Sequence, residues 1–146
     1  MKKIFSFLPV VLFLGNVILV ATIYPHLPDI IPSHFNIKGE VDGYGDKSTI
    51  LIPLILQLGL SLLLMWVGNH PEKHNYMVAI TDENRAEQYS LSSRLIRRLN
   101  FIIGLVFITI TYSITTPTFP KFIVLMELAL IFGVVVLHLF QPSKRK

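Results

Sequence analysis

Long apolar runs alternate with polar segments along this chain, and the pattern predicts a bundle of membrane-spanning helices. Four runs with almost no charge cover about residues 4–23, 48–68, 99–116 and 121–140. A helix of 20 residues, at about 1.5 Å per residue, reaches roughly 30 Å, the thickness of the hydrocarbon core of a bilayer. We therefore expect an all-α membrane protein with four transmembrane helices in a single domain over residues 1–146.

Two longer polar segments separate these runs, and they differ in character. Residues 24–47 carry three prolines and three glycines, which forbid a regular helix and favour tight turns. We predict an ordered loop with an extended beginning, a turn at residues 36–39 and a second turn at residues 42–45. In the 69–98 connection, a helix is expected to start after Thr81 and to continue into the third span. Its partial apolar stripe is typical of a helix lying at the membrane surface.

The distribution of lysine and arginine predicts the orientation of the chain in the membrane. With four spans, both termini and the 69–98 connection share one side, which holds ten of the 13 basic residues. The other side holds Lys38, Lys47 and Lys121. Because cytoplasmic segments carry the excess of basic residues, both termini are expected in the cytoplasm and the 24–47 loop outside the cell.

Composition narrows the classes of function. Hydrophobic residues make up 52% of the chain and charged residues 15%, whereas soluble domains average about 25% charged. The sequence has no cysteine, which excludes disulfides and thiol chemistry. The net charge of +4 arises from basic residues beside apolar runs, so a nucleic acid is not an expected partner. The expected environment is the lipid bilayer of the cell membrane.

A long motif runs through the first polar segment. Residues 24–47 follow the pattern Y-P-x-L-P-D-x-I-P-x-H-F-N-x-x-G-x-x-D-G-Y-G-x-K. This string resembles the signature of a bacterial family, number 1648 among the domains of unknown function. That domain is found at the N-terminus of SdpI-type membrane proteins, which protect a producing cell against its own secreted toxin. The resemblance implies an immunity function for this chain.

Polar residues inside the spans predict a site below the 24–47 loop. Asn16, Gln57 and Glu127 fall roughly 9 to 13 Å below the outer helix ends at the helical rise. Tyr112 lies four residues from the outer end of the third span. Buried carboxylates are costly in a bilayer, so Glu127 is a functional candidate by default. We expect these residues to form one polar pocket roofed by the loop.

Two questions remain open for this pocket. The alternative is that the amides and hydroxyls have only a structural role and join the helices, with each contact adding about 0.6 kcal/mol of stability. The carboxylate needs a partner, and the candidates are His34, Lys47 and Lys121.

The predicted ligand-binding residues combine the loop with the spans: His34, Asn36, Asp42, Lys47, Glu127 and Asn16. For Asn36 and Asp42, the alternative is a structural role in turns. His34, Asp42 and Glu127 have the donor atoms of an open metal site, but their spacing fits no standard ligand motif. We therefore assign no metal, no cofactor and no catalytic residue.

Three functions fit this interpretation, and we favour the first. The protein binds a secreted membrane-active peptide, or shields its target, through the loop and the pocket. Alternatively, it is an intramembrane enzyme that uses Glu127 with His34 as general acid and base. The third alternative is an accessory subunit of a transporter or signalling complex, docked through the 82–98 helix. The sequence contains no known motif for hydrolysis or phosphate binding, so nothing in it requires a catalytic function.

Overall fold

The chain is mostly helical over the residues that the computed structural model describes, 4–116 and 120–140. The long helices are α1 (Ile4–Ile23), α2 (Leu51–Asn69), α3 (Arg85–Thr115) and α4 (Lys121–Leu139). All four are long and apolar enough to cross a membrane. Short 3₁₀ turns at Tyr24–His26, Lys47–Ile50 and Pro71–Lys73 and a β-hairpin, β1 (Ile30–Phe35) and β2 (Val41–Asp46), complete the described fold.

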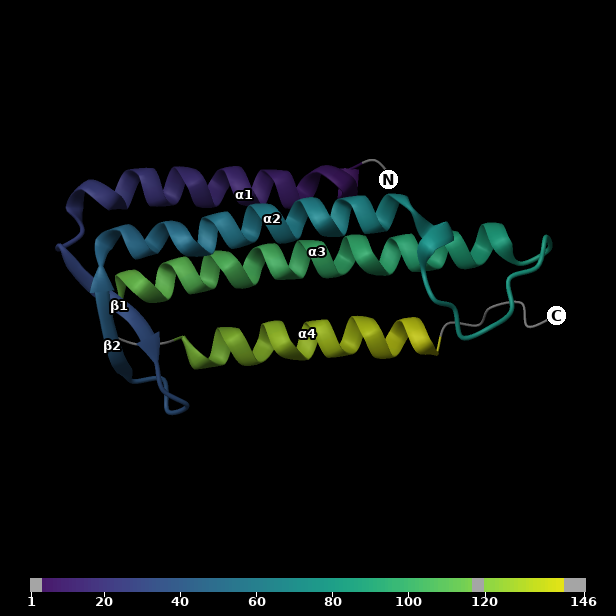
Figure 1. The fold of residues 1–146 in the computed structure, drawn as a ribbon. Coiled ribbons are helices and arrows are strands. Elements are labelled where there is room, and N and C mark those ends of the chain that lie inside the picture. The colour runs from purple at the N-terminus through teal and green to yellow at the C-terminus, as the bar shows by residue number, and fades with distance from the viewer. Residues whose placement is uncertain (1–3, 117–119, 141–146) are drawn as a thin grey trace.

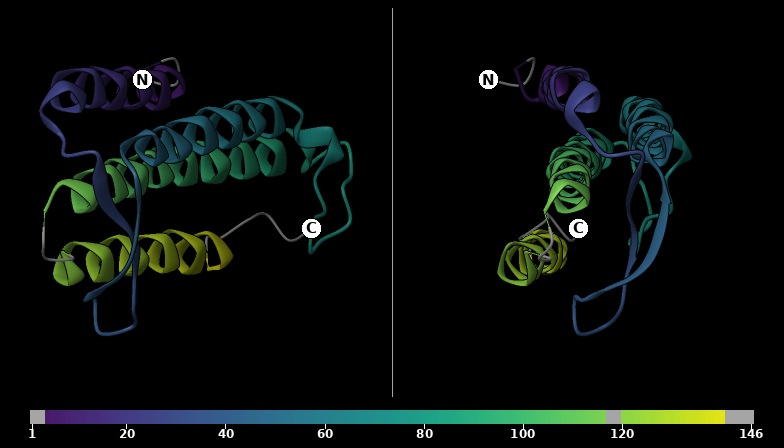
Figure 2. Two further views of the ribbon diagram at one scale, coloured as in Figure 1. Left: turned by 60° about the vertical axis from the view of Figure 1, so that its left-hand side comes forward. Right: turned by 90° about the vertical axis from the view of Figure 1, so that its left-hand side faces the viewer.

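Helix α3 lies at the centre of the bundle. Figures 1 and 2 show α1 and α2 on one side of α3 and α4 on the other. Gly104 of α3 allows close approach to α1, because a Cβ there would lie 2.9 Å from the Leu12 Cδ1 atom. Among the helices, α4 packs chiefly against α3.

The buried faces of the helices are rich in small and polar residues, and their outer faces are apolar. The buried residues of α2 are Pro53, Gln57, Ser61 and Gly68, while most of its leucines and isoleucines are exposed. Lipid tails are as apolar as leucine, so membrane helices associate through close contacts of small residues and interhelical hydrogen bonds. This inside-out distribution therefore matches a bundle surrounded by lipid.

The loop between α1 and α2 folds as an antiparallel hairpin. Its first predicted turn is confirmed: the Gly39 amide donates to the Asn36 carbonyl at 2.8 Å, and Gly39 has a φ of 76°, which favours glycine. The second predicted turn, at residues 42–45, is wrong, because these residues belong to β2. Its glycines serve close strand approach instead, since a Cβ on Gly43 would lie 2.9 Å from the His34 Cβ atom.

The hairpin packs on the ends of the helices through a small apolar core. Ile31 of β1 is 1% exposed and lies among Val20 of α1, Ile50 and Ile114 of α3. From this anchor the hairpin runs across the end of the bundle towards α4 (Figure 1). The hairpin is thus an ordered part of the fold.

The opposite end of the bundle carries the connection between α2 and α3. Helix α3 begins at Arg85, since residues 82–84 still form a turn. It then continues without a break to Thr115 and extends past the end of α2 (Figure 1). The predicted continuation of this helix into the third span is confirmed, whereas the predicted surface position is wrong, because residues 85–98 share the axis of the apolar part of α3. No proline or glycine interrupts residues 85–103.

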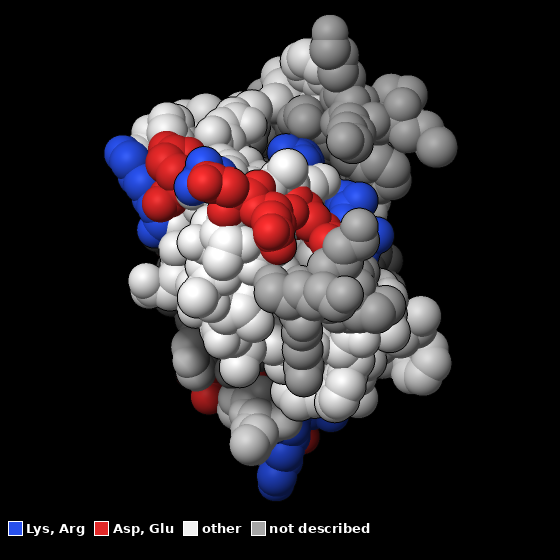
Figure 3. Space-filling model, turned by 90° about the vertical axis from the view of Figure 1, so that its right-hand side faces the viewer, with Lys and Arg blue, Asp and Glu red and all other residues white. Residues whose placement is uncertain are grey.

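Side chains of the connection pack against this extension of α3. The Tyr76 ring stacks on Tyr89 with a centroid distance of 5.7 Å, and His74 Nδ1 is hydrogen-bonded to Ser92 Oγ. Burial raises the pKa of the Tyr76 hydroxyl. Figure 3 shows a row of acidic side chains across this end, with basic side chains on either side.

Candidate functional site

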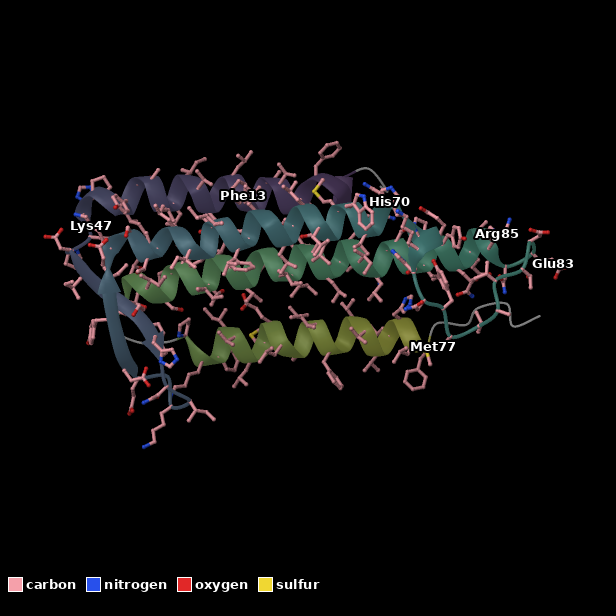
Figure 4. The ribbon with its side chains drawn as sticks, in the orientation of Figure 1. Phe13, Lys47, His70, Met77, Glu83 and Arg85 are labelled. Atoms are coloured by element: carbon pink, nitrogen blue, oxygen red, sulfur yellow. The ribbon has the colours of Figure 1, made fainter. Side chains whose placement is uncertain are left out.

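An ion pair closes the base of the hairpin. Lys47 Nζ lies 2.8 Å from Asp29 Oδ1 and 5.9 Å from the centroid of the Tyr24 ring. Figure 4 shows Lys47 at the hairpin end of the bundle. Next to it, Asp46 Oδ1 accepts a hydrogen bond of 2.8 Å from the Ser48 amide at the start of the 3₁₀ turn. Hydrogen bonds from the side chain and backbone of Ser48 lower the pKa of the Asp46 carboxyl.

A second pair joins the two strands at mid-length. His34 Nδ1 and Asp42 Oδ1 are 2.5 Å apart, and the two side chains are 71% and 42% exposed. The pair therefore faces solvent while it ties β1 to β2. His34 also lies opposite Gly43, which leaves room for its Cβ atom.

The turn of the hairpin is organised by Asn36. Its Oδ1 atom accepts hydrogen bonds from the amides of Lys38 at 2.9 Å and Glu40 at 3.1 Å. Its Nδ2 atom donates to Glu40 Oε2 at 3.0 Å. The four loop residues predicted to bind a ligand, His34, Asn36, Asp42 and Lys47, thus all hold the hairpin together. Their contact with a ligand stays a prediction.

A cavity of about 700 Å³ lies between the hairpin and the neighbouring ends of α3 and α4. Its walls include Ile31, Val41 and Ile114, and its charged lining residues are Lys38, Glu40 and Lys121; the other lining residues are Leu27, Pro28, Pro32, Gly39, Tyr44, Thr115 and Thr116. The arrangement combines apolar walls with a few polar groups, as small-molecule and peptide sites do.

Sequence reasoning missed most of the cavity. Lys38, Glu40 and Tyr44 are far from Ile114 and Lys121 along the chain and share one space only because the hairpin folds across the bundle. The motif at residues 24–47 indicates the residues that shape the hairpin, but it does not indicate that the hairpin contacts the ends of α3 and α4.

The polar residues within the helices form two separate pairs. Asn16 Nδ2 donates to Gln57 Oε1 at 2.8 Å between α1 and α2, and both side chains are fully buried. Thr109 Oγ1 donates to Glu127 Oε1 at 2.7 Å between α3 and α4.

These pairs lie on opposite sides of α3. Asn100, which faces α2 and donates to the Ser61 carbonyl at 3.1 Å, precedes Thr109 by nine residues, about two and a half helical turns. The single polar pocket predicted from the sequence is therefore wrong. Tyr112, which was expected to join it, is 52% exposed.

Glu127 does not pair with the partners considered for it. Its Oε1 atom is bonded to Thr109, while His34 pairs with Asp42 and Lys47 pairs with Asp29. Within residues 4–116 and 120–140, no three His, Cys, Asp or Glu side chains are grouped so that they could hold a metal ion. The structure thus does not bring together the His34, Asp42 and Glu127 set considered as metal ligands.

The hairpin geometry accounts for the long motif at residues 24–47, and this stretch lies within the region of the family match. Residues 11–58 match the family described as Domain of unknown function (DUF1648). The predicted resemblance is confirmed over this third of the chain. The DUF1648 segment comprises most of α1, the whole hairpin and the start of α2. No curated protein and no solved structure matches the chain.

Together, the DUF1648 segment and the four apolar helices fit a multi-pass membrane protein. In the segment, paired charges and glycines serve the shape of the hairpin. The cavity is formed jointly by the hairpin and by Ile114, Thr115, Thr116 and Lys121, which lie outside the matched region.

Proposed function

We propose that this protein is an immunity-type protein of the bacterial cell membrane that binds a secreted membrane-active peptide in the cavity under the hairpin. Both termini are cytoplasmic and the hairpin faces outward, as the excess of basic residues at the opposite end supports. The DUF1648 match over residues 11–58 supports the immunity role, because residues 24–47 resemble the domain found at the N-terminus of SdpI-type proteins.

The observation that carries the proposal is the cavity itself. Its volume of about 700 Å³ falls within the range of roughly 300–1,000 Å³ that is typical of ligand pockets. Lys121 begins α4, so the cavity lies where an apolar helix meets the aqueous side. An amphipathic peptide adsorbed on the membrane would place apolar side chains against Ile31 and Ile114. Its polar groups would meet Glu40 and Lys121.

The residues predicted from the sequence support this site indirectly. His34, Asn36, Asp42 and Lys47 hold the hairpin over the cavity. Asn16 and Glu127 fix the helices beneath it through their interhelical hydrogen bonds. Loss of these contacts would impair binding by changing the shape of the cavity.

The test is protection of cells that express the protein against a panel of secreted membrane-active peptides. Val41→Trp puts a large side chain into the cavity, and we expect it to abolish protection. Ile30→Trp is the matched control, because Ile30 is 61% exposed on the same hairpin and does not line the cavity. Both variants must reach the membrane at normal levels. Protection by neither the native protein nor Ile30→Trp, against any peptide in the panel, would contradict the proposal.

A further inference from the structure

The turn of the hairpin reaches beyond the helix bundle. Figures 1 and 2 show the hairpin crossing the helix ends and its turn projecting past α4, on the side away from α1 and α2. The base of the hairpin is fixed on the bundle by Ile31, whereas the turn at residues 36–39 has no helix directly beneath it. A membrane that surrounds the four helices must therefore lie next to this turn.

The turn also lies close to the boundary between water and lipid. Lys38 and Gly39 line the same cavity as Lys121, the first residue of α4. Beyond Lys121, α4 presents exposed apolar side chains, such as Phe122 and Leu125, that require lipid around them. The turn is thus beside the start of the apolar surface of α4.

The composition of the turn suits this position. Ile37 is fully exposed, although it is one of the most apolar residues of the hairpin. Lys38 is also exposed and follows it directly. An apolar side chain next to a lysine is the pairing that membrane-surface segments use, with the apolar group among acyl chains and the ammonium among phosphates.

From these observations we infer that the turn of the hairpin is a membrane-surface anchor, in which Ile37 enters the lipid interface and Lys38 contacts lipid phosphate. The anchor fixes the free end of the hairpin, and Ile31 fixes its base. This role does not depend on what the cavity binds.

A fluorescent reporter tests the anchor directly. Trp66 is the sole tryptophan, so Ile37→Trp in a Trp66→Phe background reports on the turn alone. In vesicles, we expect its emission to be blue-shifted and strongly quenched by phospholipids brominated on their acyl chains. Ile30→Trp in the same background is the control, because Ile30 is exposed at the base of the hairpin over the bundle. Its emission should be quenched by aqueous iodide instead.

Each other outcome overturns the inference. Emission at the wavelength of water-exposed tryptophan, with iodide quenching equal to that of the control, would place the turn in solvent. Blue-shifted emission that brominated lipid does not quench would mean that the turn is buried against protein, such as a second copy. For Lys38, we expect Lys38→Glu in the reporter to weaken lipid quenching, and more so in vesicles rich in anionic lipid. Equal quenching with and without this substitution would remove Lys38 from the anchor.

Discussion

The Asn16–Gln57 pair gives the sharpest prediction for the stability of the bundle. The two amides share one hydrogen bond of 2.8 Å in a fully buried interface between α1 and α2. That bond joins Asn16 Nδ2 to Gln57 Oε1, and among the described residues Asn16 Oδ1 and Gln57 Nε2 have no hydrogen-bond partner. Each amide therefore depends on the other for its one hydrogen bond.

The free-energy cost of replacing both partners should be smaller than the sum of the costs of the two single replacements. Asn16→Leu leaves the Gln57 amide wholly unpaired, and Gln57→Met does the same to Asn16. Interhelical hydrogen bonds in membranes average about 0.6 kcal/mol and reach about 1.7 kcal/mol. We expect each single substitution to destabilise the protein by an amount in that range, about three- to twenty-fold in the unfolding equilibrium. The double variant should cost no more than either single one, since two apolar groups leave nothing unpaired.

The assay is reversible unfolding by SDS in mixed micelles, followed by circular dichroism for the four members of the double-mutant cycle. Leu58→Met is the matched control for Gln57→Met, because Leu58 is 42% exposed on the outer face of α2. It should leave the midpoint unchanged. If the two single effects simply add in the double variant, the side chains are not coupled and the reasoning from the buried pair is refuted.

Three further predictions concern the α3–α4 contact and the hairpin. Thr109→Val leaves Glu127 Oε1 without its donor in a buried interhelical contact, so the same titration should show a loss of about 0.6–1.7 kcal/mol. Gly43→Ala forces a Cβ against the His34 Cβ atom, and proteolysis of the hairpin, which we propose to face outward, should become faster in intact cells. The pKa of the Asp46 carboxyl lies below its ordinary value of 3.8. The stability contributed by its hydrogen bond from the Ser48 amide is therefore complete above that pH and is lost as the pH falls below it.

Conservative variants separate these effects from general damage. Thr109→Ser keeps the hydroxyl donor and should retain most of the stability that Thr109→Val loses. Gly59→Ala should not alter proteolysis, because a Cβ at Gly59 would meet no atom within 4 Å. Asp46→Asn should reduce the decline in stability that the native protein shows as the pH falls below 3.8. An equal acid decline in both proteins would assign it to other carboxyl groups.

The helices were predictable because the length of each apolar run can be read directly from the sequence. Helix α1 spans Ile4–Ile23, which are the bounds of the first predicted span. The hairpin was only partly predictable. The first turn follows from Asn36 and Gly39, but the glycines of β2 resemble turn residues. Their actual use, to let the strands approach closely, depends on the side chains of the facing strand.

The polar pairs show why depth was predictable and partners were not. The helical rise places Asn16 and Gln57 at similar depths, and the structure joins them. The helical rise does not indicate on which side of α3 each of the other helices packs. Glu127 reaches Thr109 because α4 packs on the side of α3 opposite to Asn100. That arrangement is a property of the whole bundle.

The central place of α3 has a consequence for assembly. During synthesis, α1, the hairpin, α2 and α3 can already form a unit with both the Asn16–Gln57 and the Asn100–Ser61 contacts, before α4 emerges. Helix α4 then adds to one flank of α3. Since Lys121 at the start of α4 completes the wall of the cavity, a nascent chain forms the scaffold of α1, α2 and α3 first and the cavity only once α4 has emerged.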